Sequence, residues 1–212
     1  MKPKEVNPQD TSRSNAFALW MTSPMPMVTL VKTLDVSRLL RYSKRHKLSF
    51  NMLLCWCIGK AASRINEFYL LPQQGKLYQY DLLAINVIVK NILGSINSCD
   101  VPYCDDLHQF AEDYRSLTDQ AVNRCESTFT DDCMIIGTSA MIETELDCIV
   151  NQYTDKFCNP MVLWGRYRKD WLRTTLPVSF QFHHVQMDGG QAAAFLNALQ
   201  STIDGIKKFA KK

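Results

Sequence analysis

Two adjacent histidines near the C-terminal end of the sequence are the residues best suited to chemistry. The segment from Phe182 to Gly189 reads F-H-H-V-Q-M-D-G, and it follows a run in which apolar and polar residues alternate. This alternation predicts a strand that ends at the histidines. An imidazole titrates near neutral pH. At a strand end that faces a loop, it is therefore a candidate acid or base.

The two histidines differ in what they can do. Consecutive side chains on a strand leave opposite faces, so His183 and His184 cannot easily ligate the same metal ion. His184 continues the apolar face formed by Val178, Phe180 and Phe182. Partial desolvation there favours the neutral imidazole, which can act as a general base. Asp188 lies four residues further on, and Gly189-Gly190 allows a tight turn that brings the chain back near it.

The eight cysteines indicate neither a metal centre nor a redox centre. They are Cys55, Cys57, Cys99, Cys104, Cys125, Cys133, Cys148 and Cys158, and no pair has C-x-x-C spacing. We interpret them as reduced thiols that serve mainly as small core residues. We expect no metal in this protein.

Length and charge restrict the class of protein. The chain has 212 residues, which suits one domain with a sizeable core. A net charge of +3, from 24 basic and 21 acidic residues, is too balanced to favour nucleic acid or an anionic membrane as a partner. The longest apolar run, from Met52 to Ile58, is too short to cross a bilayer. No signal peptide is visible, so we expect a cytoplasmic protein.

Hydrophobic periodicity predicts mixed helices and strands in one domain, residues 1–212, with residues 1–10 loosely ordered. The expected helices span 12–20, 35–47, 49–66, 105–124 and 191–208, and the expected strands span 27–33, 76–80, 82–89, 133–137, 161–164 and 173–182. No glycine-rich phosphate loop is present. The predicted fold class is α/β (α+β), a two-layer sandwich in which helices cover a mixed β-sheet.

The segment from Pro177 to Gly189 resembles the signature of the chloramphenicol acetyltransferases. The pattern H-H-x-x-x-D-G also occurs in related CoA-dependent acyltransferases and in peptide-synthetase condensation domains, which are about twice as long. Further stretches of the chain resemble landmarks of the family, so the resemblance covers about residues 10–205. These stretches are 12–17, 66–68, 75–81, 157–160, 164–167 and 176–177.

The resemblance implies a mechanism. His184 would be the general base that takes a proton from an acceptor hydroxyl, which then attacks the thioester of acetyl-CoA. Asp188, followed by Gly189, would be structural and would pair with Arg13 rather than polarise the histidine. Family members are homotrimers with active sites between subunits, and the implied role is antibiotic resistance.

The hydroxyl that would stabilise the oxyanion is assigned less directly. The segment Ser139-Ala140 resembles the family's S-A pair, which makes Ser139 the first candidate and Thr138 the second. An alignment without gaps from Pro160 instead puts Gly137 at that position, in which case the hydroxyl is lost. A threonine that contacts CoA in the family corresponds to Leu163.

The acceptor pocket expected from the resemblance is apolar. The positions that would line it are Leu19, Trp20, Pro24, Pro26, Val28, Leu146 and Cys148. Each of these residues is equally compatible with ordinary core packing. The altered pocket leaves open an acyltransferase that acts on another hydroxylated acceptor. The altered serine segment leaves open a non-enzymatic relic of the family, and a lipoyl-linked acyltransferase is a more distant alternative.

Overall fold

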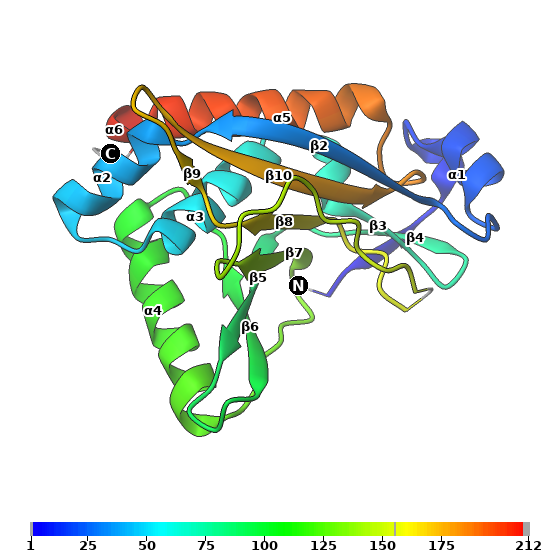
Figure 1. The fold of residues 1–212 in the computed structure, drawn as a ribbon. Coiled ribbons are helices and arrows are strands. Elements are labelled where there is room, and N and C mark those ends of the chain that lie inside the picture. The colour runs from blue at the N-terminus through cyan, green and yellow to red at the C-terminus, as the bar shows by residue number, and fades with distance from the viewer. Residues whose placement is uncertain (1, 155, 210–212) are drawn as a thin grey trace.

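A computed structural model describes residues 2–154 and 156–209, and it confirms the predicted fold class. A seven-stranded mixed sheet forms the centre of the molecule, and helices cover one of its faces (Figure 1). The strand order is β2-β10-β8-β7-β5-β6, with the short β9 paired to β10. The β5–β7 and β7–β8 pairs are parallel and the other pairs are antiparallel.

The elements have the following bounds. The strands of the main sheet are β2 (Met27–Asp35), β5 (Leu83–Lys90), β6 (Ile96–Pro102), β7 (Met134–Met141), β8 (Met161–Gly165), β9 (Arg168–Lys169) and β10 (Thr174–His183). A small three-stranded sheet contains β1 (Lys4–Val6), β3 (Leu70–Gln73) and β4 (Lys76–Gln79). The helices are α1 (Ser14–Trp20), α2 (Ser37–His46), α3 (Phe50–Ala62), α4 (Leu107–Arg124), α5 (Gly189–Asp204) and α6 (Ile206–Phe209), with 3-10 turns at Pro8–Asp10 and Asn66–Tyr69.

The helical layer packs against the sheet through α3, α4 and α5 (Figure 1). Helix α3 is buried along nearly its whole length, as its apolar composition predicts. Ser49 caps it by accepting a hydrogen bond from the Met52 N–H, although the helix ends at Ala62 rather than near Asn66. None of the described helices is long and apolar enough to span a membrane.

Strand β10 is central to the sheet and leads to the two histidines. It pairs along its length with β2 on one side, and with β8 and β9 on the other. Phe180 and Phe182 are fully buried, and the Phe180 ring packs against Phe68 and Phe195 of the helical layer. This packing fixes where the strand ends and therefore where the histidines lie.

The other face of the sheet is covered by the irregular segment between β7 and β8. The Ile149 N–H donates to Ser179 Oγ, and the Gln181 amide donates to the Asn151 carbonyl. Asn159 donates from its side chain to the Ile135 carbonyl. This face carries polar contacts where the helical face carries apolar packing.

Two local predictions are wrong. Residues 4–10, expected to be loosely ordered, form β1 and a 3-10 turn, because Lys4–Val6 pairs with β4. The glycines at 189 and 190 do not make a tight turn but begin α5, and neither has a positive φ. The chain turns earlier instead, where the Gln186 N–H donates to the His183 carbonyl.

Candidate active site

Arg13 clamps the turn that follows β10. Its side chain is almost completely buried and donates four hydrogen bonds to this turn. Nε donates to the Val185 carbonyl at 2.8 Å and Nη2 to the His184 carbonyl at 3.0 Å. Nη1 and Nη2 bind the two carboxylate oxygens of Asp188 at 2.8 and 2.9 Å. Such a fork of bonds fixes both the backbone and the carboxylate.

The guanidinium also sets the charge of Asp188. Hydrogen bonds from Arg13 hold the pKa of the Asp188 carboxyl below its usual range. The same residue precedes α5, where its backbone N–H donates to the Gln191 side chain at 3.0 Å. The structure thus brings together Arg13, Asp188 and the first turn of the helix.

The His184 ring is held between a carboxylate and an indole. Its Nδ1 lies 3.2 Å from Asp188 Oδ1, close enough for an ion pair with a protonated ring, but the geometry does not make a hydrogen bond. The Trp20 ring stacks on it at a centroid distance of 4.8 Å and an angle of 4°. The side chain is 31% exposed although Nδ1 is buried, which leaves Nε2 as the nitrogen available to a substrate.

Asp188 lies against both Arg13 and His184. It binds Arg13 through both carboxylate oxygens, and its Oδ1 also faces His184 without making a hydrogen bond to the ring. The resemblance implies that Asp188 pairs with the arginine rather than polarising the histidine, and this division of roles stays a prediction.

His183 is held in its neutral form. It is 1% exposed, and its Nδ1 accepts a hydrogen bond from the Val185 N–H at 3.1 Å. Burial, assisted by the neighbouring His184, lowers the pKa of His183 to about 4. A nitrogen that accepts a backbone hydrogen bond cannot carry a proton at the same time, so this ring fixes the shape of the turn.

Neither predicted hydroxyl lies beside His184 in the same chain. Ser139 on β7 pairs with Leu163 on β8, which pairs with Ser179 on β10. The five residues from Ser179 to His184 span roughly 16 Å of extended chain, and two strand spacings add about 10 Å across the sheet. Thr138 is buried on the helical face, where its hydroxyl donates to the Asn86 carbonyl at 2.7 Å.

The seven predicted acceptor residues do not form one pocket. Trp20 stacks on His184, the Pro26 carbonyl accepts the His184 N–H, and Val28 pairs with Phe182 next to it. Leu19 and Pro24 are exposed. Leu146 packs against Gly165 near the opposite end of the sheet, and Cys148 is exposed. The residues near His184 and the pair Leu146 and Cys148 lie apart because of the directions in which the strands run. The amino-acid sequence alone does not show those directions.

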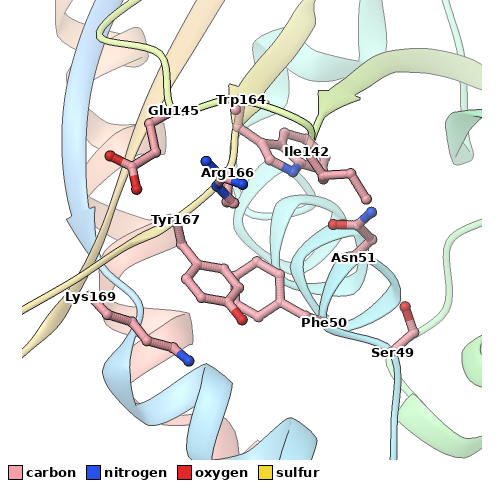
Figure 2. A pocket seen from close by; sticks show the side chains of 10 residues that line it. Ser49, Phe50, Asn51, Ile142, Glu145, Trp164, Arg166, Tyr167 and Lys169 are labelled. Carbon is pink, nitrogen blue, oxygen red and sulfur yellow. The ribbon is translucent and has the colours of Figure 1, made fainter.

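A cleft of about 600 Å³ opens at the other end of β8 from the histidines. Figure 2 shows Arg166, Tyr167 and Lys169 on one side of it and the first residues of α3 on the other. The rings of Phe50 and Tyr167 meet at 5.3 Å. The cleft has two cations, Arg166 and Lys169, against one carboxylate, Glu145. Together with the helix N-terminus and the aromatic rings, this net positive charge suits an anionic, partly planar ligand.

A second cavity, of about 500 Å³, lies on the sheet face opposite the helices. Its floor is one row of paired residues that crosses the sheet. In strand order this row consists of Gln181, Met161, Gly137, Asn86 and Asp100. The segment before β8 forms the walls with Asn151, Gln152, Thr154, Phe157 and Asn159, and Phe129 completes the rim. None of the predicted acceptor residues lines either cavity.

This polar row was not predicted from the sequence. Strands β5, β6 and β10 each place one polar residue of the row, Asn86, Asp100 or Gln181, among buried apolar residues. A polar residue inside an apolar strand was the sequence feature that could have indicated the row. The described residues contain no group of three or more His, Cys, Asp or Glu side chains able to hold a metal ion.

A family model described as chloramphenicol acetyltransferase matches residues 1–200. The chain belongs to the chloramphenicol acetyltransferase family. The protein is therefore a member of an enzyme family that transfers acetyl groups.

Relatives in the family are similar over nearly their whole length. Chloramphenicol acetyltransferase 2 of Escherichia coli is 22% identical, over 93% of this chain and 95% of its own. Chloramphenicol acetyltransferase 3 of Escherichia coli is 23% identical, over 89% of this chain and 86% of its own. At these identities the substrate does not follow from similarity.

Solved structures share the fold. A chloramphenicol acetyltransferase superimposes with a TM-score of 0.80 at 17% identity, over 95% of this chain and 99% of its own. The dihydrolipoamide acetyltransferase of Azotobacter vinelandii gives a TM-score of 0.68 at 15% identity, over 97% of this chain and 93% of its own. The fold is therefore that of both acyltransferase groups.

Proposed function

We propose that the protein transfers the acetyl group of acetyl-CoA to a hydroxyl group of a small acceptor, with His184 as the general base. The Arg13 clamp carries the proposal, because it holds the His184 backbone and places Asp188 against the ring. Nδ1 is enclosed while the ring keeps an exposed side. A base must present one nitrogen in a fixed direction to a substrate.

The proposed reaction begins when His184 Nε2 takes the proton of the acceptor hydroxyl. The hydroxyl oxygen forms a bond to the thioester carbon, and the carbonyl electrons move to its oxygen. When this tetrahedral intermediate collapses, the carbon–sulfur bond breaks and the CoA sulfur takes the proton from the imidazolium. Asp188, next to Nδ1, stabilises the imidazolium while it carries the proton.

The cleft beside α3 suits the nucleotide part of acetyl-CoA. Arg166 and Lys169 offer positive charge to phosphate groups, and the first turn of α3 adds the positive end of a helix dipole. The rings of Phe50 and Tyr167 can pack against a base. The pantetheine arm would then extend along the sheet toward the reacting centre.

We further propose that the active site forms between copies in a homotrimer. The exposed side of His184 and the segment that carries Ser139 lie far apart in one chain, so a second copy would have to bring them together. Of the two hydroxyls, Ser139 is the candidate for stabilising the oxyanion, because the Thr138 hydroxyl already donates to Asn86.

The test measures CoA thiol release with acetyl-CoA and a set of alcohols that includes chloramphenicol. His184→Ala should lower turnover on the order of 10²–10⁴-fold or more, because it removes the general base. His108→Ala changes an exposed histidine on α4 and should leave turnover unchanged. Full turnover by His184→Ala would disprove the mechanism, and no release with any acceptor would favour a non-enzymatic relic.

A further inference from the structure

We propose that the second cavity binds the acceptor, and that the acceptor is a hydroxylated amine rather than a neutral aromatic alcohol. This inference rests on the proposed function, because it names the substrate class for the same transfer. The cavity of about 500 Å³ is large enough for a small molecule of this kind.

Two buried polar atoms of residues that line the cavity, one in the floor and one in the wall, have no hydrogen-bond partner. Gln181 is 3% exposed, and its amide nitrogen donates to Thr29 Oγ1 and to the Asn151 carbonyl. Its Oε1 is buried and accepts no hydrogen bond, and the Thr154 hydroxyl in the wall is buried without a partner too. Leaving such buried groups unpaired is unfavourable. A ligand that donates O–H or N–H bonds to them would remove that cost.

The charge of the cavity favours a cation. Asp100 is the single charged residue among the described residues that line it. Asp100 is 7% exposed, and its carboxylate accepts from Asn86 Nδ2 at 2.7 Å and from the Thr130 N–H at 3.0 Å. A carboxylate has about four acceptor positions, so these neutral donors leave capacity for an ammonium group.

Two aromatic rings at the rim support the same ligand. Phe129 is 72% and Phe157 73% exposed, and both line the cavity. Aromatic faces attract ammonium groups. A neutral aromatic acceptor could use these rings, but it would leave the Asp100 charge and the Gln181 oxygen unmatched.

Gly137 makes room for this arrangement. A side chain at this position would collide with the thioether of Met161, which lies over the glycine. The middle of the row is therefore apolar and shallow, while its two ends are polar. An acceptor of this shape has a hydrocarbon centre, one hydroxyl directed to Gln181, an ammonium directed to Asp100 and a further hydroxyl left free to react at His184.

The experiment compares acceptors that differ only in the amine. CoA release is measured with serinol against glycerol, and with glucosamine against glucose. The amines should have at least about tenfold higher kcat/KM, because a hydrogen bond between charged groups is stronger than one between neutral groups. Mass spectrometry should find the acetyl group on oxygen, because an ammonium held by Asp100 is not nucleophilic.

Asp100→Asn keeps the shape of the side chain and removes its charge. In this variant the kcat/KM of each amine should lie within about twofold of the kcat/KM of its neutral analogue. Asp119→Asn makes the same change on the exposed surface of α4 and should keep the preference. Thermal melting of both variants shows whether they fold.

Equal use of amines and neutral analogues by the wild type would overturn the inference, as would an unchanged preference in Asp100→Asn. Should no acceptor release CoA, the acetyl-transfer proposal fails separately. Isothermal titration of serinol and glucosamine then tests the cavity alone. Binding that Asp100→Asn weakens at least about tenfold supports the amine site, and absence of binding overturns it.

Discussion

Asp188 contacts two side chains, the structural Arg13 and the proposed base His184. Arg13 binds both of its oxygens, and one of them also faces His184. In the proposed mechanism this carboxylate stabilises the His184 imidazolium, although the guanidinium also draws on its charge. This shared position is the residue-level feature on which the proposed mechanism depends most.

The Arg13 clamp predicts a linked loss of stability and activity. Arg13→Ala should lower the free energy of unfolding by about 2–3 kcal/mol, because it removes four hydrogen bonds from the turn. It should also reduce kcat, since His184 loses its fixed position. Arg13→Lys keeps the positive charge but not the paired hydrogen bonds of the guanidinium. It should recover only part of the free energy of unfolding and only part of kcat. Arg45→Ala, on the exposed side of α2, is the matched control.

Acid unfolding adds a second measurement for Arg13. The pKa of Asp188 is lowered in the folded state, so its contribution to stability is present above the usual carboxyl pKa. That contribution is lost as the pH falls through the lowered value. In Arg13→Ala this pH-dependent contribution of Asp188 to the free energy of unfolding should disappear. Unchanged melting, acid sensitivity and kinetics would remove the clamp from the mechanism.

The buried His183 predicts a pH dependence of stability. The unfolded chain protonates this residue near pH 6.5 and the folded chain near pH 4. Between these values the unfolded state binds more protons, so the free energy of unfolding falls as the pH falls. For one group the slope is at most about 1.4 kcal/mol per pH unit.

Urea unfolding of His183→Asn between pH 4.5 and 7.5 measures this slope. The asparagine oxygen can still accept the Val185 N–H, so the fold should survive while the slope becomes shallower. His108→Asn, at an exposed position, should keep the slope of the wild type. A wild-type slope in His183→Asn would contradict the assignment.

At the scale of elements, the sequence predicts best where one face is apolar. Strand β10 and helix α3 were predicted from apolar periodicity, and both lie in the core. Strand β6 was missed because Asn97, Ser98 and Asp100 interrupt its apolar pattern. The cavity floor could not be predicted, since it depends on the register of five strands, which is a property of the folded sheet.

Gly165 ends strand β8 and borders the cleft beside α3. A methyl group there would lie 2.9 Å from the Thr144 carbonyl oxygen and from the Leu146 nitrogen, both of them backbone atoms. Gly165→Ala should therefore lower the free energy of unfolding by about 1–3 kcal/mol. It should also raise the KM for acetyl-CoA by moving Glu145, which lines the cleft.

Gly190→Ala is the matched control, because no heavy atom lies within 4 Å of a methyl group at that position. It should melt at or near the wild-type temperature with an unchanged KM. Equal melting temperatures and equal KM values for acetyl-CoA in the two variants would contradict this prediction. They would show that residues 144–146 can move without changing the cleft.

At the scale of the whole molecule, the separation of His184 from Ser139 predicts complementation between chains. Ser139→Ala should lose roughly 10²-fold in kcat as an oxyanion donor. If sites form between copies, mixing unfolded His184→Ala and Ser139→Ala chains and refolding them should restore about a quarter of the sites in a random trimer. Light scattering should give the mass of three chains. Mixed samples no more active than the single variants would contradict a shared site.

The Arg13 clamp also has a consequence for how the protein matures. Arg13 bonds to residues 171 to 175 positions later in the chain. At ribosomal rates, roughly 10–30 s separate the synthesis of the two partners. Until then the Arg13 side chain stays in solvent, and the turn that follows β10 cannot be clamped before residue 188 has been translated. Translation products that stop before Asp188 should therefore lack the clamp and show no acetyl transfer.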